Sequence, residues 1–219
     1  MKTSALLTRG SHRSPPSLSL VEGIDFALSR VHEICGAARR TLALQVAARA
    51  LQGRDGPLIW ITADRDRTML CAPAVAAFLP PGRVLFVTPE QRRDGLWAME
   101  EALKDGGAPV VVTEVAEPPG MTPVRRLHLA AETGATSGPH IPLGLLLTPG
   151  DGGAPGIETR WRCDPAHMET RPGWRLERLR ARMLPPSTWH WTGTKATAWT
   201  PPPQQAPPGH PAPVRLGKV

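Results

Sequence analysis

Short apolar runs alternate with segments of helical periodicity along most of the chain. Runs that read as strands lie at 31–35, 58–62, 84–87, 110–113 and 143–148. Uninterrupted apolar runs are typical of parallel sheets, because helices cover both faces of the strands. Segments with apolar residues at helical spacing lie between them, at 41–51, 69–79, 89–105 and 124–133. This alternation predicts an α/β fold with a mostly parallel central sheet and helices on both faces.

Two of the expected helices have a clear starting signal. Thr88 and Thr122 each precede a proline, and threonine as N-cap followed by proline at the first helical position is a common helix start. Gly106 and Gly134 follow the periodic segments. We expect these glycines to end the two helices, because glycine readily adopts the left-handed conformation found after a helix.

The pattern becomes ambiguous in the C-terminal part. Segment 174–183 fits helical spacing and also strand alternation, and we prefer a strand there; 188–200, dense in Trp and Thr, reads as another. A further core strand is expected at 158–162. The predicted organisation is a disordered arm (1–19), a core (20–170), a basic, Trp-rich β annex (171–200) and a proline-rich disordered tail (201–219).

The net charge of +7 is unevenly distributed. From Arg171 onward there are eight Lys and Arg residues and one acid, so this segment carries the whole excess. Cations interleaved with indoles suit single-stranded nucleic acid, although a solvated segment whose tryptophans pack on the core explains the same composition. The candidate contacts in this segment are Arg175, Arg178, Arg180, Arg182, Trp189 and Trp191.

Arg125 and Arg126 are a second basic candidate. They lie early in an expected helix, where cations oppose the macrodipole. This placement favours an external anion or an acidic partner, and a salt bridge to a local acid such as Glu132 is an equally good explanation.

A strand, a glycine turn and a helix start meet near Gly36, an arrangement that can hold a phosphate. A working phosphate-binding loop reads G-x-x-x-x-G-K-[ST]. Here the second glycine is missing, the loop is two residues short, and Arg40 replaces the lysine. We interpret the segment as a vestigial nucleotide loop, with no bound cofactor expected. Its residues are Gly36, Arg39, Arg40, Thr41 and, at the same edge of the sheet, Asp64.

The remaining sequence signals exclude several classes of protein. Cys35, Cys71 and Cys163 have no metal-binding or disulfide-type spacing, and we expect buried free thiols. His32 lies in a predicted strand without a nucleophile nearby in the sequence, and is expected to be a hydrogen-bonded core residue rather than a base. No apolar run has the length of a signal-peptide core or a membrane span, so a cytoplasmic protein without membrane contact is expected.

Several segments together resemble the RecA-like core. Four of them look more closely like the ImuA family of RecA-related accessory proteins: HEICG (32–36), LWAMEEAL (96–103), RRLHLAAE (125–132) and ETRWR (158–162). The resemblance spans residues 18–195. It implies a RecA-type fold and a role in the SOS response, where this family works with ImuB, a Y-family-like protein, and with an error-prone C-family polymerase.

The resemblance also implies where catalysis is lost. RecA-type ATPases have an acidic residue that orients water and an aspartate that holds magnesium; Asp64 stands at the first position and Thr113 at the second. Without the lysine and the metal carboxylate, phosphoryl transfer lacks most of its electrostatic stabilisation. We expect a non-catalytic scaffold for ImuB, for itself or for single-stranded DNA. A residual ATP-binding switch and a cell-division inhibitor of the SulA type stay open as alternatives.

Overall fold

A computed structural model describes residues 16–63, 70–167, 172–182, 184–192 and 199–200. The tails predicted to be disordered lie outside these residues, apart from the end of the N-terminal arm. Asp64, named as part of the vestigial nucleotide loop, also lies outside them.

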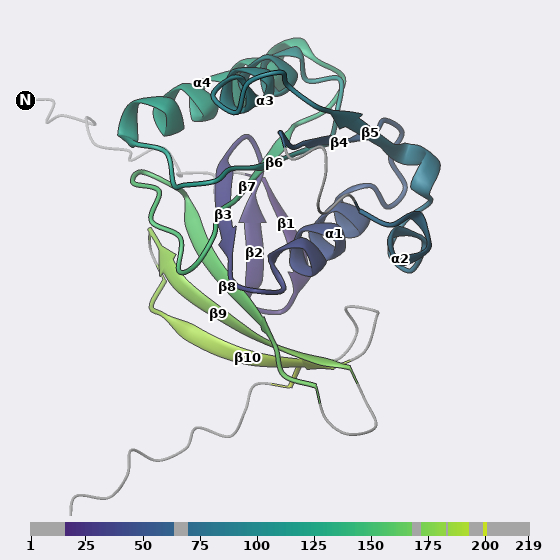
Figure 1. The fold of residues 1–219 in the computed structure, drawn as a ribbon, viewed down its shortest axis with the longest axis vertical. Coiled ribbons are helices and arrows are strands. Elements are labelled where there is room, and N and C mark those ends of the chain that lie inside the picture. The colour runs from purple at the N-terminus through teal and green to yellow at the C-terminus, as the bar shows by residue number, and fades with distance from the viewer. Residues whose placement is uncertain (1–15, 64–69, 168–171, 183, 193–198, 201–219) are drawn as a thin grey trace, which may run out of the picture.

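A nine-stranded sheet forms the centre of the fold (Figure 1). Its strands are β3 (Val31–Cys35), β4 (Leu58–Ile61), β5 (Val84–Val87), β6 (Val110–Glu114), β7 (Leu143–Leu147), β8 (Thr159–Pro165), β9 (Gly173–Ala181), β10 (Ser187–Thr192) and β11 (Trp199–Thr200). The spatial order is β11-β10-β9-β8-β3-β7-β6-β4-β5. Neighbours from β8 to β5 are parallel, whereas β9, β10 and β11 pair antiparallel. The predicted α/β class with a mostly parallel sheet is confirmed.

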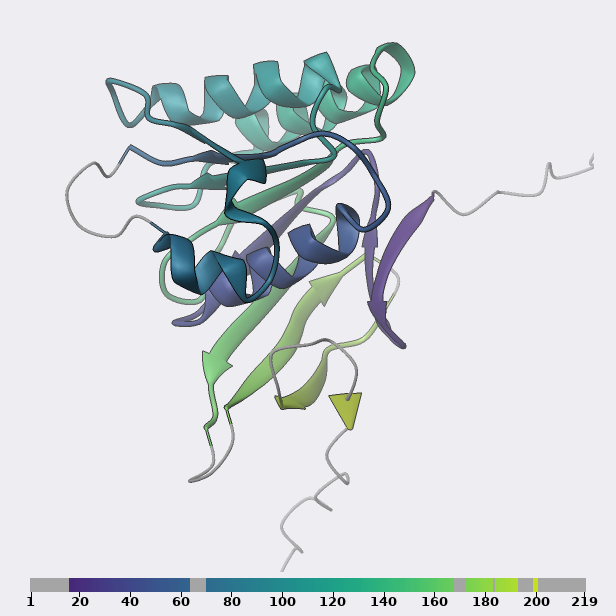
Figure 2. The same cartoon turned by 90° about the vertical axis from the view of Figure 1, so that its right-hand side faces the viewer.

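Helices cover both faces of the sheet (Figure 2). One face carries α1 (Arg39–Ala50), α2 (Ala72–Ala76) and a separate hairpin, β1 (Ser17–Val21) and β2 (Ile24–Ala27), with the short 3-10 helix η1 (Pro81–Arg83) nearby. The other face carries α3 (Asp94–Asp105) and α4 (Met121–Ser137). Each layer has its own buried apolar cluster, which explains why the strands between them are apolar on both sides.

The hairpin begins within the predicted disordered arm, so that arm is shorter than expected. Leu18 and Leu20 are buried, Ser17 and Ser19 are exposed, and Gly23 turns the chain with a φ of 81°. Ile24 and Phe26 are buried on the opposing strand. Short period-two patterns of this kind are easily overlooked because each strand contributes only two buried residues.

Two helix boundaries differ from the prediction. α3 begins at Asp94, because residues 91–93 form a turn in which the Asp94 N–H donates to the Gln91 oxygen. α4 begins after Gly120 and continues through Gly134. Gly134 is buried where the two helices meet, and a β-carbon there would clash with the carbonyl oxygen of Leu103. It therefore permits close helix packing instead of ending the helix.

Gly106 ends α3 in the left-handed conformation, as predicted. Strand β9 covers most of the expected segment 174–183. β10 covers only the first part of the strand expected at 188–200, because residues 193–198 lie outside the described part of the chain. Both strands are hydrogen-bonded into the main sheet through β8, so the annex extends the core sheet.

Candidate functional site

The turn after β3 has its backbone donors bound within the protein. The N–H groups of Gly36, Ala37 and Ala38 donate to Gly150 O (3.1 Å), Asp164 Oδ1 (2.8 Å) and Cys163 O (2.9 Å). In a phosphate-binding loop such groups converge on the ligand. Here acceptors at the end of β8 and in the loop after β7 occupy the position that the ligand would take.

Asp164 supplies a negative charge from the chain itself to this turn. Arg162 Nε donates to its second carboxylate oxygen at 2.6 Å. Partial burial acts to raise the pKa of Asp164, but the hydrogen bond from Ala37 and the charge of Arg162 outweigh it and lower the pKa below its usual value. The carboxylate is therefore ionised at neutral pH.

Gly36 is required by this close approach. Its φ is 88°, which non-glycine residues rarely adopt. A β-carbon at this position would overlap the carbonyl oxygen of Cys163 and lie 2.8 Å from Asp164 Oδ1. The glycine kept from the phosphate-loop pattern thus accommodates strand β8.

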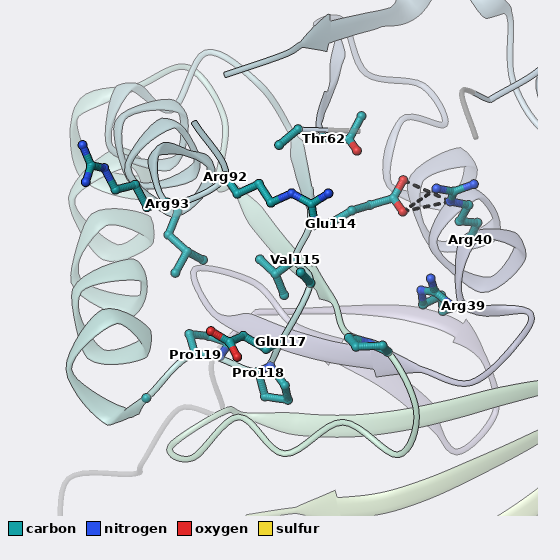
Figure 3. A pocket seen from close by; sticks show the side chains of 15 residues that line it. Arg39, Arg40, Thr62, Arg92, Arg93, Glu114, Val115, Glu117, Pro118 and Pro119 are labelled. Carbon is teal, nitrogen blue, oxygen red and sulfur yellow. Dashed lines mark hydrogen bonds and ion pairs between the residues drawn. The ribbon is translucent and has the colours of Figure 1, made fainter. Parts of the chain in front are cut away.

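Arg40 does not act as a substitute for the missing lysine. Its Nε lies 3.0 and 2.9 Å from the two carboxylate oxygens of Glu114, and its Nη2 lies 2.7 Å from Oε2 (Figure 3). Trp60 Nε1 donates to Oε1 of the same carboxylate at 2.8 Å. The charge of Arg40 is thereby neutralised across the gap between α1 and β6.

The other predicted loop residues lie close by. Arg39 begins α1, and its Nη1 donates to Gly36 O at 3.2 Å. Thr41 is partly buried in the same first turn. Within the described ranges, no group of three or more His, Cys, Asp or Glu side chains is placed to hold a metal ion.

A pocket of about 710 Å³ lies at the carboxyl edge of the parallel strands (Figure 3), where open α/β sheets bind ligands. Its charged lining residues are Arg39, Arg40, Arg92, Arg93, Glu114 and Glu117. The sequence reasoning missed Arg92, Arg93 and Glu117. The available signal was their position directly after β5 and β6, since loops that follow parallel strands share this edge.

Two of the family-like motifs meet at a fully buried carboxylate. Glu33 of HEICG accepts hydrogen bonds from Arg160 Nε of ETRWR (2.5 Å), from Thr148 Oγ1 (2.8 Å) and from the Gly153 N–H (2.8 Å). These contacts fix β3 to β8 and to the loop after β7. Glu33 and Arg160 therefore hold the architecture together.

The RRLHLAAE motif also serves packing. His128 Nδ1 accepts the Val31 N–H at 3.3 Å, and its Nε2 lies 3.2 Å from Gly156 O. Glu132 forms a salt bridge with Arg30. Arg126 pairs with Glu100 of the LWAMEEAL motif at 2.8 Å, so the expected local salt bridge exists with a different acid.

His32 is a core residue, as predicted. Its ring is buried, with Nδ1 2.7 Å from Thr159 Oγ1 and Nε2 2.9 Å from Ala27 O. Burial lowers its pKa to about 4. It is therefore a neutral, hydrogen-bonded side chain that links β3 to β2 and β8.

Three of the predicted nucleic-acid or partner contacts are buried in the core. Arg178 is buried, donates to Pro185 O (3.0 Å) and Gly23 O (3.1 Å), and lies over the rings of Trp161 and Trp189. Trp189 and Trp191 are themselves buried, so neither indole can stack on a base. The alternative explanation, tryptophans packed on the core, is correct for these residues.

The remaining basic candidates lie on the surface. Arg125, Arg175, Arg180 and Arg182 are all exposed. Arg175 also donates to Glu177 at 2.6 Å. Arg125 lies on α4, whereas Arg175 and Arg180 lie on β9.

The cysteines partly follow expectation. Cys35 and Cys163 are buried free thiols, and burial raises the pKa of each to about 12. Cys71 is exposed, against the prediction, because it directly precedes α2 at the surface.

Comparison with known proteins does not assign the chain to a family. No family model matches the chain, and no curated protein sequence matches it. Among solved structures it is similar to SulA from Pseudomonas aeruginosa, with 18% identity and a TM-score of 0.44 over 55% of this chain and 98% of SulA. A likeness this weak supports no assignment. In the described part of the chain, none of the helices combines the length and the apolar character needed to cross a membrane.

Proposed function

We propose that the chain is a non-catalytic accessory protein of the ImuA kind, built on a RecA-type core. In this proposal it acts in SOS-induced, error-prone translesion synthesis by binding ImuB and the error-prone C-family polymerase. The proposal rests on the motif resemblance for its pathway and on the turn after β3 for its lack of catalysis.

One observation carries the non-catalytic part. The amides of the turn are bonded to Gly150, Cys163 and Asp164, and Arg40 is bonded to Glu114. A nucleotide would have to displace two carboxylates to gain the same donors. Phosphoryl transfer relies on positioned positive charge, and here Glu114 neutralises Arg40, the residue that stands in place of the lysine.

The contacts among the motifs support the family part. HEICG meets ETRWR through Glu33 and Arg160, and RRLHLAAE meets LWAMEEAL through Arg126 and Glu100. Residues that carry the resemblance thus contact one another around β3 and between α3 and α4. This is expected if the likeness reflects a shared packing arrangement.

Single-stranded DNA remains part of the proposal in a reduced form. Arg175, Arg180 and Arg182 on or directly after β9 are exposed, whereas the tryptophans that would have stacked on bases are buried. Binding through these arginines would be electrostatic, sensitive to salt and indifferent to sequence.

The test is affinity purification of the tagged full-length chain from cells with and without DNA damage. We expect enrichment of a Y-family-like protein and a C-family polymerase after damage. A matched variant with Glu33→Ala, expected to disrupt the packing around β3, should lose them. The proposal would be overturned if neither the Y-family-like protein nor the C-family polymerase is enriched after damage. It would also be overturned if overexpression causes cell filamentation and neither protein is recovered.

A further inference from the structure

The pocket at the carboxyl edge has an excess of positive charge. Four arginines and two glutamates line it, and Arg40 is already neutralised by Glu114. Arg93 has only a 3.8 Å contact with Asp94. Arg39 and Arg92 form no ion pair with any other residue that the structure describes. Glu117 is the other acid among the described lining residues, so cations outnumber acids in that part of the lining.

Helix starts add to this positive potential. α1 and α3 begin at the pocket with Arg39 and the turn at Arg92 and Arg93, and Gly120 at the start of α4 also lines it. None of the three helix starts has a side-chain cap, and the first turns of α1 and α4 contain no acid. The helix dipoles therefore favour an anion at this edge.

The walls between these charges are apolar. Leu96, Val115, Pro118, Pro119 and Pro149 contribute to the lining, and none of the lining residues that the structure describes is aromatic. Single-stranded nucleic acid usually needs aromatic rings on which its bases stack. An apolar wall with arginines at its edges instead suits a segment that carries both carboxylates and aliphatic side chains.

Residues 1–15 and 201–219 do not match this description, because they contain five Lys and Arg residues and no Asp or Glu. An acidic segment of another molecule would complement the charge of the pocket.

We propose that this pocket is a docking site for an acidic peptide segment of a partner protein. Two carboxylates of the peptide bind Arg39 and Arg92, and an aliphatic side chain between them packs against the proline wall. The inference does not depend on the identity of the partner, and it holds whether or not the chain acts in translesion synthesis.

The experiment uses the full-length protein and a fluorescein-labelled peptide of repeated Glu-Asp-Leu triplets, followed by fluorescence anisotropy. The uncharged Gln-Asn-Leu peptide and a labelled oligothymidylate are the comparison probes. We expect saturable binding of the acidic peptide alone. Arg92→Gln and Arg39→Gln should each weaken it about tenfold, as loss of a charge-assisted hydrogen bond predicts.

Arg54→Gln is the matched control, because it removes the same charge from an exposed residue in the turn after α1, at the other end of that helix. Arg92 is exposed and forms no described ion pair, so its variant should fold normally. Equal weakening by Arg54→Gln and Arg92→Gln, or no weakening by either pocket variant, would overturn the proposal. Oligothymidylate binding that depends on Arg39 and Arg92 would also overturn it, in favour of a nucleic-acid site. The outcome of this peptide titration does not change the outcome expected from the affinity purification, so the two proposals can fail independently.

Discussion

Arg40 at the start of α1 holds both carboxylate oxygens of Glu114 at the end of β6. The two residues are 74 positions apart in the chain, and Trp60 of β4 donates to the same carboxylate. This ion pair closes the position at which a phosphate loop would offer its cation. Arg40 and the backbone donors of the turn after β3 are therefore bound by residues of the chain.

The Arg40 and Glu114 pair should contribute measurably to stability. Its side chains are largely shielded from water, so the charges interact more strongly than a surface pair. In a double-mutant cycle of Arg40→Gln and Glu114→Gln, we expect a coupling energy of about 1–2 kcal/mol. Urea denaturation measures it. Strictly additive effects of the two substitutions would show that the ion pair contributes no coupling energy to stability.

Asp164 should stabilise the turn after β3. In Asp164→Ala the Ala37 N–H exchanges its acceptor for water, which costs about 1 kcal/mol in the free energy of unfolding because Ala37 is exposed. Formate or phosphate should restore part of the loss by entering the vacated space. Asp151→Ala is the control, because Asp151 bonds the same Arg162 but is largely exposed. Similar losses for both variants, without rescue by anions, would contradict this role.

Gly36 should tolerate no side chain. Gly36→Ala combines backbone strain at a φ of 88° with a clash against Cys163, and we expect a loss of about 3 kcal/mol or more. Gly53 provides a matched comparison: its φ is 67°, but a β-carbon there meets no atom within 4 Å. Gly53→Ala should cost only about 1 kcal/mol. Equal losses in thermal unfolding would mean that conformation alone, and not the approach of β8, requires glycine.

Only part of this site could be predicted from the sequence. The uninterrupted apolar strands revealed a parallel sheet, and the eroded glycine pattern revealed a loop with altered chemistry. Asp164 could not be linked to Ala37 because 127 positions separate them, and the contact depends on how β8 pairs with β3. Gly134 was misread because a glycine that permits helix contact has the same sequence signature as one that ends a helix.

The basic C-terminal segment shows the same limit. Composition alone could not distinguish an arginine exposed to DNA from Arg178, whose guanidinium lies over two indole rings of the core. Strand alternation placed Trp174, Leu176, Arg178, Arg180 and Arg182 on one side of the strand, but only the first three are buried. It gave no sign that this side faces the hairpin, because the hairpin itself was not recognised.

His32 predicts a dependence of stability on pH. Its pKa is lowered to about 4 in the folded protein, from 6.5 in the unfolded chain. Between these values the unfolded chain binds a proton that the folded chain does not. Stability should therefore fall as the pH drops below 6.5 and level off near pH 4, by about 3 kcal/mol in total.

Urea denaturation of the wild type and His32→Gln across this range measures the effect. The variant should lose most of the slope, keeping some from His128, whose pKa is lowered in the same direction. An unchanged slope in the variant would show that His32 is not the group responsible.

Titration of the purified full-length protein with a fluorescent ATP analogue, with and without single-stranded DNA, tests the central claim most directly. The internal bonds of Gly36, Ala37, Ala38 and Arg40 predict no saturable binding in the micromolar range and no turnover of ATP. Micromolar binding, or hydrolysis stimulated by DNA, would contradict the claim that the chain's own carboxylates have replaced the phosphates.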